Sequence, residues 1–553
     1  MSFKSLVVLV AAAGLAAAGC SSSSKTATPP SSSGPPTTTV AAPGGSYTRP
    51  ACTPKPSGPV TATKVAGSTS DYDIASFDGT LIRAHWFPVA GSGPKRAPTL
   101  LEGPGWGSPG ATNASPAGSD LFGGLGIYNL HQHGYNVLTW DPRGFGASGG
   151  TIESDSAQYE GRDVQQLIDW IAKQPGVQLD GPGDPRMGMV GASYGGGIQL
   201  VTAAIDCRVD ALVPQIAWHS LGTSLYKADT VKSGWGNLLY ALGAKHKLDA
   251  HITSAEIAGN TTGVLSAADR QWFLDRGPAD LVGKITAPTL FEQGTVDTLF
   301  TLDEAVSNFN ILKANGVPTA MLWMCSGHGV CLTDPGDTKR PGDAAIAWVD
   351  RYVKDDRTVH IGPAFEYVDQ SGASFSADQF PPPASTPITA TGAGTLTLKA
   401  GGGAGPAHSN GKLGGLGAAV FPITPGRADN AVNVPIPIDA TANLVGAPRV
   451  TLDYKGTSPA GPAPTRVFAQ LVDEASGLVL GNQITPIDVT LDGASHTTMV
   501  PIEMVAYTAK SGALLTLQLV ATTTAYARPR LGGTINFASV KIEIPTVTGV
   551  TKK

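Results

Sequence analysis

The sequence predicts an α/β domain built on a mostly parallel sheet, followed by an all-β sandwich domain. Before about residue 360, apolar runs of strand length alternate with helical segments. After it, apolar and polar residues alternate with a period of two. All nine tryptophans lie between Trp86 and Trp348, so the composition of the 553-residue chain changes at the same place.

Six short apolar runs are the predicted buried strands of the first domain. They are residues 99–101, 135–140, 187–190, 211–213, 289–291 and 320–323. Between two of these runs, Val164, Leu167, Ile168 and Ile171 recur at helical spacing. Strands that alternate with helices favour a parallel sheet covered on both faces.

Three segments carry the period-two pattern of the second domain. They are residues 450–454, 515–519 and 540–544, in which every second residue is apolar. Half-buried strands separated by Gly, Pro and Asp turns predict an antiparallel sandwich. This domain contains no group of residues that resembles a catalytic site.

The first twenty residues predict export. Lys4 precedes an apolar run from Leu6 to Ala18, which is too short for a permanent transmembrane helix. The small residues before Cys20 resemble a bacterial lipobox, so residues 1–20 are predicted to be a lipoprotein signal peptide with Cys20 lipidated. The alternative is an ordinary secretory signal cleaved nearby, and both interpretations place the protein outside the cytoplasm.

A tether is predicted over residues 21–63. Residues 21–60 contain 9 Pro, 9 Ser, 7 Thr and 4 Gly and almost nothing apolar. Such a composition cannot offset the entropy lost on ordering, so we expect a disordered linker between a membrane anchor and the folded domains.

Four cysteines remain besides Cys20, an even number that suits disulfide bonds in an oxidising compartment. Three pairings are possible, and the short spacing of Cys325 and Cys331 favours this pair together with Cys52–Cys207. No CxxC motif or cluster of His and Cys indicates zinc, so neither a metal nor a cofactor is expected.

The charge composition argues against nucleic acid as a partner. The chain has 38 basic and 43 acidic residues, a net charge of −5, and no basic stripe that would neutralise a phosphate backbone.

The motif Gly191-Ala192-Ser193-Tyr194-Gly195 carries the first chemical signal. It follows an apolar strand and precedes a helical segment, which is the context of a nucleophile elbow. Ser193 is therefore the predicted nucleophile, and the backbone amide of Tyr194 is a predicted oxyanion donor.

A serine hydroxyl needs a base, and the base needs an orienting carboxylate. Asp297 follows the strand 289–291 and His328 follows the strand 320–323, in the order nucleophile, acid, histidine. Asp297 could instead be a turn residue and Asp303 a helix cap, but only Asp297 directly follows the strand. Surface or packing roles are expected for the other histidines considered, which are His131, His133 and His219.

Two further features are predicted around this site. Cys325 and Cys331 flank His328, so a disulfide between them would hold the base in place. Gly105 or Trp106, in the loop after the strand 99–101, could supply a second oxyanion amide. The alternative for this loop is a glycine-rich turn with Trp106 packed over the sheet.

Residues 218–284 are predicted to form a lid. This stretch is rich in Trp and Leu, and most of these side chains should pack within the lid itself. Two or three of them are expected to line an apolar acyl or P1 pocket over Ser193.

Several blocks together resemble the Xaa-Pro dipeptidyl-peptidase (S15) and cocaine esterase family of α/β-hydrolases. These blocks are residues 141–148, 163–175 and 186–196, the Asp297 and His328 segments, and the sandwich strands at 447–452, 467–473 and 516–520. The resemblance implies an α/β-hydrolase fold with a helical lid, followed by a jelly-roll, galactose-binding-like domain. It also implies a triad of Ser193, Asp297 and His328. The esterase branch carries Asn-Pro-Tyr where this chain has Gly103-Pro104-Gly105-Trp106, which leaves the second oxyanion donor and esterase specificity open.

The sequence thus predicts an exported serine hydrolase that forms an acyl-enzyme and cleaves peptides in the manner of a dipeptidyl-peptidase. Hydrolysis of esters or amides is the alternative within the family, and a non-catalytic surface-binding lipoprotein is the alternative of another class. The predicted organisation is a catalytic domain over 64–360 and a sandwich over 361–553.

Overall fold

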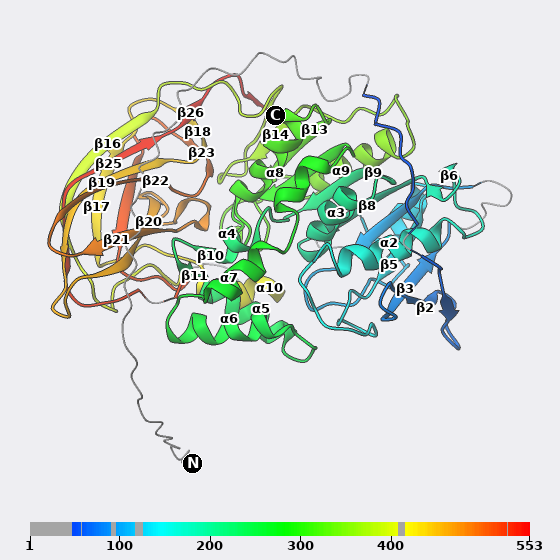
Figure 1. Cartoon of the computed structure of the whole chain (residues 1–553). Helices are drawn as coiled ribbons and strands as arrows, with labels where there is room; N and C mark the ends of the chain where they lie inside the picture. The colour runs from blue at the N-terminus through cyan, green and yellow to red at the C-terminus, as the bar shows by residue number, and fades with distance from the viewer. Residues whose placement is uncertain (1–46, 57, 90–95, 117–124, 408–414, 528) are drawn as a thin grey trace, which may run out of the picture. The chain divides into compact units, whose positions relative to one another are not determined.

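A sheet of twelve strands organises the first part of the chain (Figure 1). The computed structural model describes residues 47–56, 58–89, 96–116, 125–407, 415–527 and 529–553, with only the backbone of residues 415 and 416. The strands, in spatial order, are β1 (Ala62–Lys64), β2 (Asp71–Ala75), β3 (Leu81–Phe87), β5 (Asn136–Trp140), β4 (Thr99–Gly103), β8 (Met187–Ala192), β9 (Val209–Gln215), β12 (Thr289–Gly294), β13 (Thr319–Met324), β14 (Phe365–Val368), β15 (Ser374–Ala377) and β27 (Thr551–Lys552).

The strands from β5 to β14 are parallel, whereas those at both edges of the sheet are antiparallel. All six predicted apolar runs lie in this parallel part, which confirms the α/β prediction. Because parallel strands end at the same edge, the loops after β4, β8, β12 and β13 all leave the sheet on one side.

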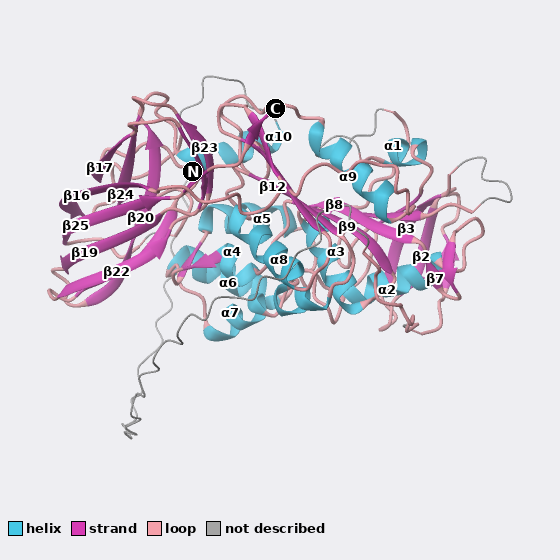
Figure 2. Cartoon of the chain, turned by 90° about the horizontal axis from the view of Figure 1, so that it is seen from above, coloured by secondary structure: helices cyan, strands magenta, loops and turns pink. Residues whose placement is uncertain are grey.

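Helices cover both faces of the sheet (Figure 2). On one face lie α2 (Glu160–Ile171), α3 (Tyr194–Ile205) and α8 (Leu302–Ala314), and on the other lie α1 (Ile127–Gln132) and α9 (Arg340–Tyr352). Neighbouring strand residues divide between the two cores: Leu101 packs with the first group of helices and Leu100 with the second. The alternation follows from the period of two along a strand.

The predicted lid region folds mainly as short helices. It contains α4 (Leu221–Leu225), α5 (Ser233–Gly243), α6 (Ala250–Thr261), α7 (Ala267–Leu274) and the 3₁₀ helix η1 (Ala279–Lys284), with a small hairpin of β10 (Tyr226–Lys227) and β11 (Thr230–Val231). A second small hairpin, β6 (Leu179–Gly181) with β7 (Asp184–Pro185), precedes β8.

The later residues form antiparallel sheets around a core of their own. One four-stranded sheet contains β16 (Ile388–Thr397), β25 (Thr534–Ile544), β19 (Arg449–Thr457) and β22 (Ser495–Pro501). The other contains β17 (Ala431–Pro437), β24 (Leu514–Val520), β20 (Ala463–Asp473) and β21 (Thr485–Leu491). The smaller elements are β23 (Val505–Ala509), β18 (Ala442–Gly446), β26 (Thr546–Val547), α10 (Gly415–Val420), η2 (Phe421–Ile423) and η3 (Leu480–Asn482).

Both four-stranded sheets contribute to one hydrophobic core, so they form a sandwich. Val450, Leu452 and Tyr454 of β19 and Leu515, Leu517 and Leu519 of β24 all point into this core, as the period-two pattern predicts.

The main sheet extends past the predicted boundary at residue 360. β14 and β15 continue it, and β27 at the end of the chain pairs with β15. The first strand of the sandwich, β16, begins only at Ile388. The change in tryptophan content therefore marked the last large helix of the first domain and not the end of its sheet.

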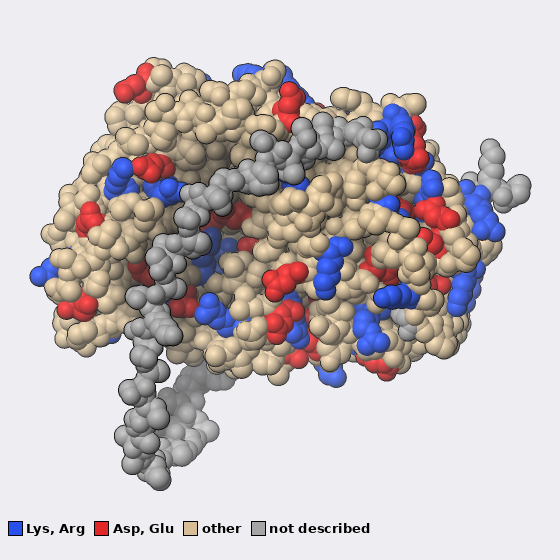
Figure 3. Space-filling model, turned by 45° about the horizontal axis from the view of Figure 1, so that its top comes forward, with Lys and Arg blue, Asp and Glu red and all other residues tan. Residues whose placement is uncertain are grey.

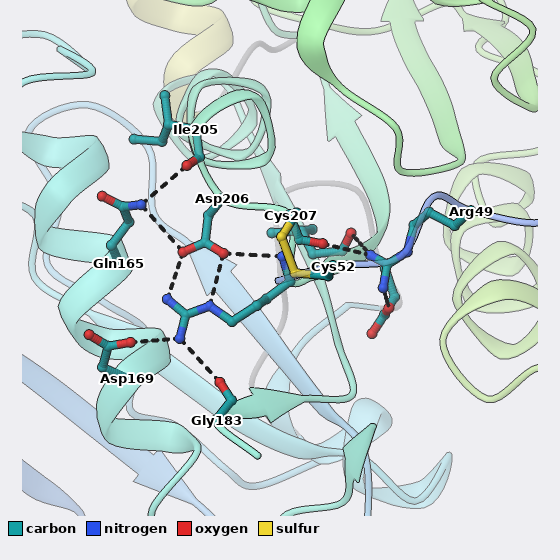
Figure 4. The surroundings of a disulfide bond; sticks show 11 residues. Arg49, Cys52, Gln165, Asp169, Gly183, Ile205, Asp206 and Cys207 are labelled. Carbon is teal, nitrogen blue, oxygen red and sulfur yellow. Dashed lines mark hydrogen bonds and ion pairs between the residues drawn. A yellow bond between two sulfur atoms is a disulfide. The ribbon is translucent and has the colours of Figure 1, made fainter. Parts of the chain in front are cut away.

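The predicted tether also ends earlier than residue 63. Residues 1–46 lie outside the described residues, but Cys52 is bonded to Cys207 (Figure 4). Arg49 forms an ion pair with Asp210 and donates a hydrogen bond to the carbonyl of Cys207 at 3.1 Å. These contacts fix the segment on the first domain although its composition is that of a linker.

The buried guanidinium of Arg208, next to Cys207, forms ion pairs in the same region. Arg208 is 1% exposed and donates to Asp206 at 2.7 and 2.9 Å and to Asp169 at 2.6 Å. Its neighbours Asp169, Asp206 and Gly183 are drawn in Figure 4. A paired, fully hydrogen-bonded charge is tolerated in this position, whereas removal of one partner would leave a buried unpaired charge.

Charged side chains are interspersed on the face drawn in Figure 3, where Lys and Arg lie among Asp and Glu and do not gather in a stripe. Within the described residues, no helix is both long and apolar enough to cross a bilayer.

We expect the double variant Cys52→Ser/Cys207→Ser to lose about 2–5 kcal/mol of unfolding free energy, because the bond closes a long loop. The two cysteines are 155 residues apart. Cys207 precedes the amino end of β9, at the edge of the sheet opposite Ser193, so hydrolysis by the folded protein should not change. Denaturant unfolding with parallel assays checks this prediction, and an unchanged midpoint would contradict it.

Candidate active site

Ser193 lies in a strained turn between β8 and α3. Its φ of 57° and ψ of −117° are unfavourable for a residue with a side chain, and such strain is found at nucleophile elbows. The flanking glycines allow the turn to lie against β4. A Cβ on Gly195 would be 1.9 Å from the carbonyl oxygen of Gly103, and one on Gly191 would be 2.6 Å from the same atom. The spacing of the motif therefore reflects contact between the turn and the end of β4.

Ser193, His328 and Asp297 are joined by hydrogen bonds. His328 Nε2 lies 2.8 Å from Ser193 Oγ, and His328 Nδ1 lies 2.7 Å from Asp297 Oδ2. The backbone amide of His328 donates to the same carboxylate oxygen at 3.1 Å. The structure thus brings together the three residues that the sequence predicted, each from the carboxyl end of a different parallel strand.

The carboxylate of Asp297 is fully buried and oriented by its own loop. Oδ1 accepts hydrogen bonds from the amides of Leu299 at 3.0 Å and Phe300 at 2.8 Å. Backbone donors satisfy Oδ1 of this buried carboxylate, so Oδ2 is left for the histidine.

Close packing holds the loop of His328 against the loop of Asp297. A Cβ on Gly329 would lie 1.6 Å from the carbonyl oxygen of Val296, so only glycine fits there. Cys325 and Cys331 form a disulfide that closes this loop. The rings of Trp235 and Phe300 meet the imidazole edge to face at 5.7 and 5.1 Å.

The other three histidines, for which surface or packing roles are expected, contact polar groups elsewhere in the protein. His131 Nε2 lies 3.0 Å from the carbonyl oxygen of Phe87, His133 lies 3.5 Å from Asp350, and His219 Nδ1 lies 2.7 Å from Asn308 Oδ1. Asp303 lies in the first turn of α8, where burial and then the Glu503 carboxyl raise its pKa.

Two backbone segments with candidate oxyanion amides adjoin the turn of Ser193. Tyr194 is the first residue of α3, so its amide has no acceptor within the helix. The loop that carries Gly105 and Trp106 leaves β4 directly beside β8, because Gly103 pairs with Gly191. The side chain of Trp106 packs on Tyr194 and Phe145, with ring centres 5.4 and 5.1 Å apart, and its Nε1 donates to Leu239 at 2.9 Å.

Below the turn, Tyr194 is buried among acidic side chains. Its hydroxyl accepts a hydrogen bond from the amide of Asp155 at 3.3 Å. Burial, followed by repulsion from Asp163, raises the pKa of Glu160 to about 8, and burial raises the pKa of Asp155 as well. These carboxyls therefore favour their neutral forms, which suits their position beneath an uncharged turn.

A cavity of about 110 Å³ opens over Ser193, and most of its lining is apolar. Residues of the predicted lid supply much of this lining, and more of them do so than the two or three expected. They include Trp218, Leu221, Leu225, Leu239, Tyr240 and Phe273. An apolar lining of this kind suits an apolar group next to the serine.

Two charged residues of this cavity are not predicted from the sequence. Lys232 is buried, its Nζ donates to the carbonyl of Leu299 at 2.8 Å, and burial lowers its pKa to about 8. Glu256 of α6 is the only carboxylate among the described residues that line the cavity, and burial raises its pKa. Neither residue belongs to a motif, so only the folded lid reveals them.

The large parallel sheet and this arrangement of Ser193, His328 and Asp297 are consistent with an α/β-hydrolase. Residues 78–329 match the family model described as X-Pro dipeptidyl-peptidase (S15 family), which confirms the resemblance seen in the sequence. This match supports a hydrolase, and serine-type chemistry is consistent with that family.

Solved structures support the same fold. A CocE/NonD family hydrolase from Staphylococcus aureus superposes with a TM-score of 0.64 at 13% identity, over 86% of this chain and 93% of the other. An aminopeptidase from the marine sediment archaeon Thaumarchaeota archaeon gives a TM-score of 0.60 at 12% identity, over 91% and 99% of the two chains.

Curated relatives match only a part of the chain. A polyketide transferase of Penicillium is 28% identical over 145 residues, which are 26% of this chain and 43% of the relative. The chain thus spans less than half the length of this relative.

We expect Cys331→Ser to lower the rate of ester hydrolysis roughly tenfold, because the loop of His328 loses its closure and small displacements of a catalytic group are costly. Hydrolysis of p-nitrophenyl acetate, measured with the Cys52→Ser/Cys207→Ser variant as a control, checks this prediction. Unchanged activity of Cys331→Ser, or of the protein after selective reduction of this bond, would contradict it.

Proposed function

We propose that the protein is an exported serine hydrolase that acts through a covalent acyl-enzyme. The observation that carries the proposal is the hydrogen-bonded chain from Ser193 Oγ through His328 to Asp297 Oδ2. With Nδ1 protonated and bonded to Asp297, His328 presents a free Nε2 lone pair to the serine hydroxyl.

In the first half-reaction, His328 takes the proton of Ser193 as the oxygen attacks the substrate carbonyl carbon. The same proton then passes to the leaving amine or alcohol, and the acyl group stays on Ser193. A water molecule, deprotonated by His328, attacks the acyl carbon and restores the serine. Asp297 remains ionised and stabilises the imidazolium that forms in each step.

The developing oxyanion is assigned in this proposal to the amide of Tyr194 and to an amide of Gly105 or Trp106. The free first amide of α3 and the loop beside β8 support these roles. Each such donor contributes about 2.7–4 kcal/mol to the barrier reduction.

For the substrate, the lining of the cavity supports an acyl side with an apolar group. Cleavage after a dipeptide additionally needs an anion for the free amine, and Glu256 is the candidate because it is the sole carboxylate among the described lining residues. The family match favours this peptidase activity, whereas the apolar lining suits simple esters and amides equally well.

The variant Glu256→Gln separates the two substrate classes. If the protein is a dipeptidyl-peptidase, the variant should raise KM for a Xaa-Pro amide at least tenfold and leave acyl esters unaffected, because only the amide substrate carries an amine. Kinetics with alanyl-prolyl p-nitroanilide and p-nitrophenyl butyrate check this expectation. No turnover of the anilide by the unaltered protein would exclude the peptidase and leave the esterase.

Labelling by a fluorophosphonate tests the hydrolase against a non-catalytic surface-binding lipoprotein. We expect the unaltered protein to be labelled and Ser193→Ala to remain unlabelled, since the probe reacts with an activated serine. Gel fluorescence with Ser154→Ala, another serine of the cavity, as a matched control makes the comparison. Equal labelling of the Ser193→Ala variant, or none of the unaltered protein, would exclude this mechanism.

Export and lipidation at Cys20 are part of the proposal. The two disulfides support an oxidising compartment, and the small residues before Cys20 support a lipoprotein signal. The later domain is proposed to be a jelly-roll of the galactose-binding type, which its two four-stranded antiparallel sheets support.

In a bacterial host, Cys20→Ala should move the protein from the membrane fraction to the soluble fraction and abolish incorporation of a palmitate analogue. Cys20 is the residue expected to carry the lipid, so its replacement should remove both the label and the membrane anchor. Retention of the label in the variant would contradict lipidation at this position.

A further inference from the structure

The turn η3 of the sandwich contacts both loops that carry the acid and the base. Gln483, which follows η3, donates from Nε2 to the main-chain oxygen of Asp297 at 2.8 Å. Asn482 donates from Nδ2 to the main-chain oxygen of Val330 at 2.7 Å. Val330 lies two residues after His328, inside the disulfide loop.

These two contacts are buried. Asn482 is 2% exposed and Gln483 is 6% exposed, and the two carbonyl groups belong to loops outside the sheet. A buried carbonyl needs a hydrogen-bond donor, and here the donors come from side chains more than 150 residues away. The sandwich therefore completes the hydrogen bonding of the first domain at this point.

The turn itself is fixed from both sides. Leu480 packs in the core of the sandwich, and the amide of Gly481 donates to Gln370 Oε1 at 2.9 Å. Gly481 has a φ of 63°, and a Cβ on it would lie 2.9 Å from the main-chain oxygen of Thr295. Glycine at this position lets the turn approach the acid loop closely.

We infer that Asn482 and Gln483 are positioning residues, through which the sandwich sets the distance between His328 and Asp297. This inference rests on the proposed function, in which His328 is the base and Asp297 is the acid. It makes the sandwich a part of the catalytic apparatus, although its sequence carries no catalytic motif. Neither residue reaches the cavity over Ser193, so both act through the loops and not on the substrate.

The test compares Gln483→Met with a matched control. Methionine keeps the length of the side chain and removes the donor. Gln518→Met is the control, because Gln518 is also buried in the sandwich and donates to the main-chain oxygen of Ala428 at 3.0 Å and to Asn433 Oδ1 at 2.9 Å, neither of which belongs to the two loops. Asn482→Gly is the companion variant, since glycine tolerates the φ of 55° found there.

With p-nitrophenyl acetate, we expect Gln483→Met to lower kcat 10- to 100-fold and to leave KM within about twofold, because a misplaced catalytic pair slows chemistry more than binding. Gln518→Met should retain kcat even if its melting temperature falls as far as that of Gln483→Met. The double variant Asn482→Gly/Gln483→Met should lose less than the product of the single effects, because both contacts hold the same pair of loops.

Hydrogen–deuterium exchange tests the contact independently of activity. Peptides that cover residues 295–300 and 327–333 should exchange faster in Gln483→Met and at the original rate in Gln518→Met. The inference is overturned if Gln483→Met loses no more kcat than the control, or if its two loops exchange like those of the unaltered protein. If the unaltered protein neither hydrolyses esters nor reacts with a fluorophosphonate, the proposed function fails, and the exchange data alone decide the positioning role.

Discussion

The site depends on the chain of hydrogen bonds that runs from Ser193 through His328 to Asp297. Two loops and one turn must meet within hydrogen-bonding distance for this chain to form. The parallel sheet makes the meeting possible, because β8, β12 and β13 end at the same edge. Glycines at positions 195 and 329 then remove the side chains that would keep the backbones apart.

Each neighbouring part of the molecule contributes differently to the surroundings of these three hydrogen-bonded residues. The helical region from α4 to α7 supplies the apolar walls of the cavity, and its Trp235 packs on the imidazole. The buried Lys232 joins the start of α5 to the loop of Asp297 through the carbonyl of Leu299. The sandwich adds donors to both loops from η3. The geometry of the three residues is thus supported by groups far from them in sequence.

The sequence predicts the sheet, and the three residues that it selects are hydrogen-bonded to one another in the structure, because the signals for both are local. Apolar runs of strand length, the glycines around Ser193 and a polar residue directly after a strand can each be read within a few positions. The end of the first domain is predicted less well, since β14, β15 and β27 are short strands that lie beyond the tryptophan-rich segment. The contacts of Gln483 and Asn482 cannot be predicted from the neighbouring sequence. An Asn or Gln in a turn looks the same in a sequence whatever group its side chain contacts.

The linker composition of residues 47–63 illustrates the same limit. Proline and threonine predict disorder there, yet one disulfide and one ion pair fix this segment on the folded domain. Local composition describes what a segment would do by itself, whereas a covalent bond to Cys207 is a long-range property. The pairing of Cys52 with Cys207 therefore indicates the placement of this segment better than its composition does.

The central claim is that Ser193 carries the acyl group during turnover. The most direct measurement is mass spectrometry of the protein after rapid acid quenching of its reaction with a slowly hydrolysed p-nitrophenyl ester. We expect one added acyl mass per chain, located by peptide mapping on Ser193, and a burst of one equivalent of p-nitrophenol. Turnover of the ester with no burst and no added mass, or with the acyl group on another residue, would contradict it.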